Sequence, residues 1–340
     1  MNKELTQGPL LDKKGNLVEP GFSNSLIKEY KRSMIHGKKW RIKEWDYYYI
    51  GNQQYGLCLT ISDVSYLALI SVTFLDFRNR LQPAKTILKP FTFGKMGLPS
   101  TSKEGDISFE NKDCQMSFTH EDGKRHLKCH FTNFIDNQNL DADIVLEETN
   151  PNTIVVATPF KKKKHFYYNQ KINLMKSKGS VKLGYNEYDF SKDTFGLLDW
   201  GRGVWTYKNT WYWSSLNARY NKHNIGFNLG YGFGDTSTHS ENIFYYDDKA
   251  YKLEDVEFII PTDNKGKDDY LSSWRMISKS GDINLTFKPI LNRHDDTNVL
   301  LIRSKQNQVF GYFSGYFIVN EQKIEFEDLM GFAEKVYNRW

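Results

Sequence analysis

Residues 114–131, CQMSFTHEDGKRHLKCHF, contain the pattern that decides the fold class. Apolar and polar residues alternate over 114–118 and again over 127–131. Between the two runs lies Asp122-Gly123, a pair that adopts the positive φ angles a tight hairpin turn requires. The stretch therefore predicts two antiparallel strands with one face buried and the other exposed.

The same alternation returns along most of the chain. Over 225–234 the apolar residues share one face and glycines occupy the other, while 242–260 predicts a second hairpin. Residues 283–287 and 309–319 are typical of further strands, and the apolar run 64–75 predicts a buried strand that is too short to span a bilayer as a helix. Many strands with polar turns between them indicate an all-β barrel or sandwich.

Helical periodicity is weak. Residues 25–36 predict one short helix, with Asn24 or Ser25 as its N-cap, and residues 332–340 could form a second. We therefore expect a fold with few and short helices.

The length of 340 residues exceeds what one hydrophobic core usually serves, so two domains are expected. The sequence changes character between Thr149-Asn150-Pro151 and the basic run 161–164. We place the boundary there, which gives an N-terminal β-domain of residues 1–155 and a C-terminal β-domain of residues 156–340.

Charge and cysteine content exclude several classes of protein. The net charge of +5 is mild and the basic residues are scattered except for Lys161–Lys164, so no nucleic-acid partner is expected. That run is more typical of a solvated loop or a guarded strand edge than of a lipid-binding site. The N-terminus lacks signal-peptide features, and three cysteines cannot all pair, so we expect a cytoplasmic protein with reduced thiols.

Residues 198–217, LDWGRGVWTYKNTWYWSSLN, predict a binding site. They hold four of the eight tryptophans, together with Asp199 and Arg202. An indole N–H needs a partner when buried, and a carboxylate held against indoles loses hydration, which favours its protonated form. Asp199 is therefore the first candidate for a general acid, and the alternative is a structural ion pair with Arg202.

Two other carboxylates and a set of aromatic and amide side chains complete the expected site. Glu241 precedes an apolar strand, and Glu334 lies close to the C-terminus; either could activate water or return a proton. The candidate substrate-binding residues are Glu44, Trp45, Trp200, Arg202, Trp205, Tyr207, Trp211, Trp213, Asn217 and Asn242.

Neither a nucleotide loop nor a metal site is expected. Gly230, Gly232 and Gly234 are not followed by a helix and indicate a bent strand or a close backbone approach instead. On an alternating strand, Cys129 faces away from His126 and His130, so the three cannot converge on a metal. We therefore expect no cofactor.

Five separated blocks resemble one family over nearly the whole chain. They are GPLLDKKGNLVEPGFS (8–23), KEWDYYYIG (43–51), 198–217, SENIFYYDDKAYKL (240–253) and DLMGFAEKVYNRW (328–340). Together they are similar to the domain-of-unknown-function family numbered 2804. The chain also resembles, more distantly, the carotenoid 1,2-hydratase and AttH-like proteins of the lipocalin-like group.

This resemblance implies two lipocalin-like β-barrels in tandem and a small-molecule ligand. In the hydratases, an acidic residue in the Trp/Asp-rich block is implied to protonate an alkene before water adds, and Asp199 occupies that place here. The His and Glu of the family's run are replaced by Trp200 and Gly201. Three functions follow as alternatives: an acid–base enzyme of hydratase, isomerase or lyase type, a carbohydrate-active enzyme using paired carboxylates, or a non-catalytic carrier.

Overall fold

The computed structural model describes residues 2–299 and 302–339. The chain divides into two compact units, Lys3–Trp205 and Thr206–Trp340, the second also including Met1–Asn2. We call them the N-terminal and the C-terminal unit. The division lies after Trp205 instead of after residue 155, because the strands that follow residue 155 join the first sheet. The Lys161–Lys164 run connects two paired strands of that sheet.

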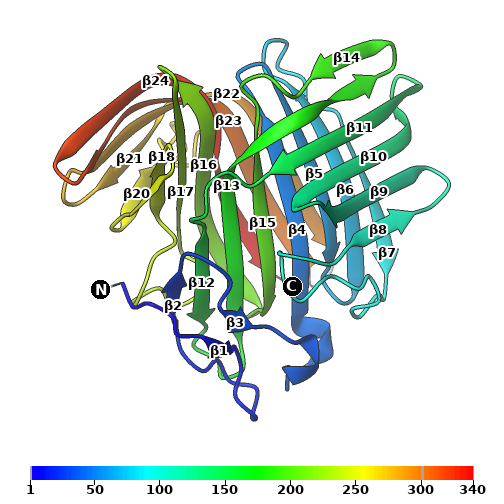
Figure 1. Cartoon of the computed structure of the whole chain (residues 1–340), viewed down its shortest axis with the longest axis vertical. Coiled ribbons are helices and arrows are strands. Elements are labelled where there is room, and N and C mark those ends of the chain that lie inside the picture. Colours follow the sequence, from blue (N-terminus) through cyan, green and yellow to red (C-terminus); the bar gives the residue numbers. More distant parts are fainter. Residues whose placement is uncertain (1, 300–301, 340) are drawn as a thin grey trace. The chain divides into compact units, whose positions relative to one another are not determined.

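The N-terminal unit is a curled, 13-stranded antiparallel sheet (Figure 1). Its main path runs β7-β6-β5-β4-β15-β13-β11-β10-β9-β8, while β12 and β14 pair with β13, and β2 pairs with β12. A separate two-stranded sheet joins β1 and β3. The elements are β1 Gly8–Pro9, β2 Gly21–Ser23, β3 Lys28–Glu29, η1 Arg32–Met34, η2 Lys39–Arg41, β4 Ile42–Gly51, β5 Tyr55–Asp63, β6 Leu67–Asp76, β7 Ala84–Pro90, β8 Ile107–Glu110, β9 Cys114–Glu121, β10 Lys124–Ile135, β11 Gln138–Glu147, β12 Ile154–Pro159, β13 Phe166–Leu183, β14 Asn186–Asp189 and β15 Phe195–Val204.

The C-terminal unit is a nine-stranded antiparallel sheet in the order β19-β18-β17-β16-β24-β23-β22-β21-β20. It is also curled into a half-barrel. Its strands are β16 Lys208–Tyr220, β17 His223–Tyr231, β18 Ile243–Tyr246, β19 Lys249–Lys252, β20 Val256–Ile259, β21 Trp274–Ser278, β22 Ile283–Val299, β23 Ile302–Val319 and β24 Gln322–Arg339.

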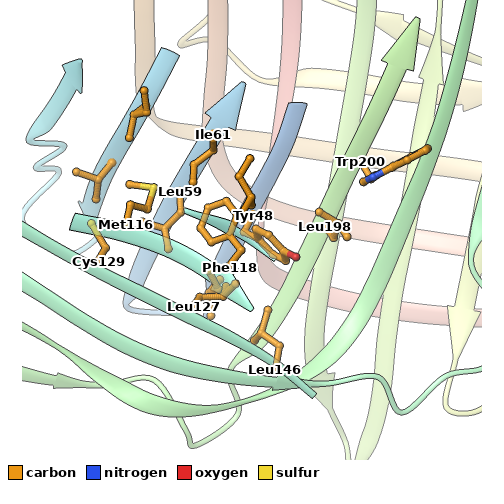
Figure 2. Packing of buried hydrophobic residues seen from close by; sticks show 14 of the residues in the cluster. Tyr48, Leu59, Ile61, Met116, Phe118, Leu127, Cys129, Leu146, Leu198 and Trp200 are labelled. Carbon is orange, nitrogen blue, oxygen red and sulfur yellow. The ribbon is translucent and has the colours of Figure 1, made fainter. Parts of the chain in front are cut away.

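Each sheet encloses its own apolar core on one face, as strand alternation requires. Figure 2 shows the N-terminal core, in which Tyr48, Phe118 and Trp200 lie among buried aliphatic side chains. The core of the C-terminal unit combines aliphatic side chains with packed aromatic rings, and Phe227 and Phe287 both contact Phe313. The all-β class with two antiparallel barrel-like sheets is confirmed.

The hairpin that decided the fold class is confirmed in detail. Phe118 pairs with Leu127, Met116 with Cys129 and Cys114 with Phe131 across β9 and β10. All six side chains are buried in the core. Apolar alternation therefore fixed both the strands and their register.

Both predicted α-helices are wrong. Residues 25–36 contain β3, which pairs with β1, and the single 3-10 turn η1. Residues 332–339 belong to strand β24, and Trp340 lies outside the described residues. Strand β24 pairs with β16 and β23 on its two sides, and these ladders override the weak helical pattern. Over the described ranges, the structure contains no helix long and apolar enough to cross a membrane.

Candidate functional site

One face of strand β16 carries two tryptophans, Trp211 and Trp213. Leu216 and Ala218 belong to the core of the unit, and Trp211 and Trp213 alternate with that set, so they lie on the opposite face. In the sheet register, Trp213 stands between Glu334 of β24 and Gly230 of β17. Both tryptophans and Glu334 are therefore held by rigid strands and not by loops.

Hydrogen bonds join Trp211 directly to a carboxylate and Trp213 to another carboxylate through an amide. The Trp211 Nε1–H donates to Glu334 Oε1 at 2.9 Å. The Trp213 Nε1–H donates to Asn228 Oδ1 at 2.6 Å, and Asn228 Nδ2 donates in turn to Glu241 Oε2 at 3.1 Å. We call Trp211, Trp213, Asn228, Glu241 and Glu334 the carboxylate–indole cluster.

Gly230 makes room for the second carboxylate. A Cβ atom at this position would lie 2.5 Å from Glu241 Oε1, which is closer than any side chain tolerates. The Gly230 amide also donates to Asn242 Oδ1 at 2.7 Å, which anchors the segment that carries Glu241. The expectation that these glycines mark a close approach is confirmed at Gly230. Glu334 and Gly230 lie two strand spacings apart, about 10 Å between Cα atoms.

Lys252 is a half-buried lysine beside Glu241. Its ammonium donates to Ser240 Oγ at 2.6 Å, to the Asn242 carbonyl at 3.0 Å and to the Leu253 carbonyl at 3.3 Å. Burial lowers the pKa of Lys252 from 10.5 to about 7, while the charge of Glu241 acts in the opposite direction. Lys252 therefore bonds the residue before Glu241, Ser240, and the residue after it, Asn242.

The buried amine makes stability depend on pH. Between pH 7 and pH 10.5 the unfolded chain binds the Lys252 proton and the folded chain does not, so the free energy of unfolding rises with pH in this window. We expect the difference between wild type and Lys252→Met to change by up to about 1.4 kcal/mol per pH unit there. Chemical denaturation at several pH values measures it. Lys249→Met, an exposed change on the same strand, is the control, and parallel pH profiles of wild type and Lys252→Met would contradict the assignment.

Asp199 lies in the N-terminal unit and pairs with a lysine. Its Oδ1 is 2.9 Å from Lys171 Nζ, directly across the β13–β15 ladder, and accepts a hydrogen bond from Asn169 Nδ2 at 2.6 Å. The alternative ion pair with Arg202 is not formed. On a strand, residues three apart point to opposite faces, so the two side chains separate.

Aromatic rings lie beside Asp199 on the same face of the sheet. Trp45 covers Gly201, where a Cβ atom would lie 2.0 Å from the ring. Trp45 also packs edge-on against Trp205, with ring centroids 5.1 Å apart, and stacks on Tyr167 at 5.9 Å. Trp45 therefore lies on the same face of the sheet as Asp199 and contacts Trp205, whereas Trp200 lies on the opposite face, and Trp211 and Trp213 belong to the C-terminal unit.

The opposite face of β15 buries Arg202 and Trp200. Arg202 Nη2 lies 2.9 Å from Asp46 Oδ1, and the guanidinium also donates to the Pro99 and Trp45 carbonyls. The guanidinium lies 4.3 Å from the centroid of the Trp200 ring. Arg202 is thus bound by backbone and carboxylate groups of its own unit.

Glu44 is engaged in a buried network on the same strand as Asp46. It accepts a hydrogen bond from the Tyr30 hydroxyl at 2.7 Å and forms an ion pair with Arg32. The remaining candidates are dispersed: Tyr207 is exposed, Asn217 is buried on β16, and Asn242 donates to the Glu254 carbonyl.

Sequence reasoning missed four polar residues of these clusters. Asn228 and Lys252 bind the Glu241 segment, and Asn169 and Lys171 bind Asp199. Polar residues inside otherwise apolar strands were the available signal, since such residues need partners when buried.

Within the described ranges, no group of three or more His, Cys, Asp or Glu side chains is arranged to hold a metal ion. Cys129 is buried in the core, whereas His130 lies 2.6 Å from Asp141 Oδ1 on the other face of the sheet.

The protein is therefore of the antiparallel half-barrel class, and its carboxylates and indoles lie on strands or directly beside them. The chain belongs to the family described as domain of unknown function DUF2804, which matches residues 2–340. No curated protein matches the chain by sequence.

Solved structures share the fold at low sequence identity. An AttH-like protein from Nitrosomonas europaea is 11% identical, with a TM-score of 0.53 over 90% of this chain and 96% of that one. Kievitone hydratase from Nectria haematococca is 13% identical, with a TM-score of 0.53 over 88% of each chain. The expected family is confirmed, and the likeness to AttH-like and hydratase proteins holds for the fold.

Proposed function

We propose that this protein is a small-molecule enzyme that performs acid–base chemistry of hydratase type with its own side chains. The observation that supports the proposal best is the carboxylate–indole cluster, in which Glu241 and Glu334 flank Trp213 on one sheet face. The hydratase fold of a structural neighbour is consistent with this reaction class. Function still depends on the site, because one fold serves many activities.

The two carboxylates suit two different roles. Below the lowered pKa of about 7, Lys252 is a cation beside Glu241, and this charge favours a carboxylate that can accept a proton from water. Burial of Glu334 favours its neutral acid form, which suits proton donation, whereas the hydrogen bond from the Trp211 Nε1–H stabilises the carboxylate that remains afterwards. The face of the Trp213 ring would stabilise positive charge that develops on the substrate.

The proposed reaction adds one water molecule across a carbon–carbon double bond of the substrate. Glu334 gives a proton to one carbon while Glu241 takes a proton from water, whose oxygen bonds to the other carbon. Glu334 ends as a carboxylate and Glu241 as an acid. Transfer of one proton between them through solvent restores the starting state.

Asp199 stays a predicted general acid. Its carboxyl group is paired with Lys171 at 2.9 Å, and substrate binding would have to separate this pair before Asp199 could act on a substrate. Asp199→Asn is therefore measured beside the Glu241 and Glu334 variants.

A thermal-shift screen of terpenoid and phenolic alkenes, sugars, sugar phosphates and fatty acids tests the proposal. A ligand that binds the folded state raises its apparent stability, so we expect an alkene-bearing class to raise the Tm by a few degrees. Incubation of each hit with the enzyme in ¹⁸O-labelled water should then yield a product that has gained one labelled water.

The other outcomes separate the alternatives. Selective binding of sugars, with cleavage or no labelled hydration product, would favour the carbohydrate-active alternative. Binding of an apolar compound without any turnover would favour a carrier and would overturn the enzymatic proposal.

A further inference from the structure

One rim of the N-terminal sheet gathers four connecting segments. Register pairs place the end of β12 beside the start of β13, the start of β13 beside the end of β15, and the end of β15 beside the start of β4. The turn between β5 and β6 and the end of β7 lie at the same edge, because these strands continue the ladder from β4. We call the segments 30–41, 64–66, 91–103 and 160–165 the basic rim.

Three aromatic side chains project from this rim into solvent. Phe91 is 70% exposed, Phe93 46% and Trp40 39%. Phe91 and Phe93 have φ angles of 55° and 48°, in the left-handed region that bulky residues rarely adopt. Exposed aromatic side chains on a strained backbone indicate a functional segment, since strain of this kind concentrates at functional sites.

Hydrogen bonds hold the two phenylalanines in place. The Phe91 amide donates to the Tyr66 carbonyl at 2.7 Å, and the Phe93 amide donates to the Ser65 carbonyl at 2.8 Å. Thr92, between them, is buried. The backbone therefore presents alternate side chains outward from a fixed loop.

The same loop is tied to the segment that carries Trp40. The single O–H of Ser65 has two acceptors within hydrogen-bond distance, the Lys39 carbonyl at 2.8 Å and the Ile42 carbonyl at 2.7 Å. The Gly94 amide donates to the buried carboxylate of Asp63 at 2.8 Å. Trp40 and the phenylalanines thus extend from one bonded platform.

The charge of the basic rim has a single sign. Its four segments contain no Asp or Glu. Lys161–Lys164 are all exposed, as are Lys38, Lys39 and Lys95. Arg41 links the lysine run to Trp40: its guanidinium lies 4.1 Å from the Trp40 ring centroid, and its charge adds to burial and Lys162 in lowering the pKa of His165.

We infer that the basic rim docks on the surface of a bilayer that contains anionic lipids. Lysines close to an anionic membrane attract its surface, and exposed aromatic side chains insert at the level of the headgroups. Lysines alone at a sheet edge prevent pairing with another strand and need no exposed Phe or Trp beside them. The basic rim has both lysines and exposed aromatic side chains, which distinguishes it from an ordinary solvated loop. A polynucleotide partner is less suited, because Arg41 already covers one face of Trp40, where a base would stack.

Vesicle co-sedimentation of the full chain tests the inference. We expect binding to phosphatidylcholine vesicles containing phosphatidylserine, little binding to pure phosphatidylcholine, and weakening at high salt. Replacing Lys161–Lys164 by Gln should reduce the partition coefficient at least about tenfold. Phe91→Asn with Phe93→Asn should reduce it similarly while keeping the fold, because Asn tolerates a positive φ.

Control variants outside the basic rim test whether vesicle binding comes from this rim or from nonspecific adsorption. Tyr185→Asn removes a fully exposed aromatic residue, and Lys112→Gln with Lys124→Gln removes exposed charges outside the rim. Both should bind vesicles as wild type does. Equal binding to neutral vesicles, equal loss in the control variants, or binding to RNA that exceeds binding to anionic vesicles would each overturn the inference.

Discussion

Substitution of Arg202 by Met should lower the free energy of unfolding by about 3–5 kcal/mol. Arg202 is fully buried, and its guanidinium compensates the buried carboxylate of Asp46 at 2.9 Å. Removing the cation leaves that carboxylate without its counter-charge and leaves the Pro99 carbonyl without its donor. Denaturant unfolding monitored by tryptophan fluorescence measures the loss.

A double variant distinguishes an ion-pair effect from lost packing. Arg202→Met with Asp46→Leu removes both charges and keeps apolar volume, so it should recover a large part of the loss. The control is Lys128→Met, which removes an exposed partner of Asp143 and should change stability by less than about 1 kcal/mol. If the double variant were as unstable as the sum of its single changes, the loss would come from packing.

The strands were predictable because their signal is local. Alternation over a few residues, together with a turn such as Asp122-Gly123, determines a hairpin without reference to distant residues. The helix prediction for residues 332–339 was wrong for the opposite reason, since this segment is a strand only because it pairs with β16 and β23. A boundary near residue 155 was expected because the sequence changes character between Thr149-Asn150-Pro151 and the Lys161–Lys164 run, whereas this run forms a turn between paired strands.

The hydrogen-bond and ion-pair partners of the site residues could not be predicted from the spacing of residues in the sequence. Asp199 takes Asn169 and Lys171 from a strand about thirty residues earlier, and Glu241 is reached through Asn228 on a neighbouring strand. Trp211, Trp213, Glu241 and Glu334 were all identified as candidates by residue type. Which face of which sheet they share required the register.

Glu334→Gln should decrease kcat by about 10²–10⁴-fold on the compound that the ligand screen identifies. The amide keeps the size of the side chain and an oxygen that can accept the Trp211 Nε1–H bond, now 2.9 Å long, but it cannot donate a proton as a carboxylic acid does. Glu241→Gln should cause a loss of similar size through the base. In both variants the ligand-induced Tm shift should persist, because binding does not require proton transfer.

Glu325→Gln is the matched control, since it makes the same change at an exposed position of the same strand. It should leave both kcat and ligand binding as in wild type. Trp211→Phe removes the N–H donor to Glu334 and part of the ring that packs on Phe233 but keeps the carboxyl group, so it should reduce kcat less than Glu334→Gln while altering its pH dependence. Full turnover by Glu334→Gln, with loss of activity in Asp199→Asn, would move the general acid to the N-terminal unit and contradict the assignment of Glu334.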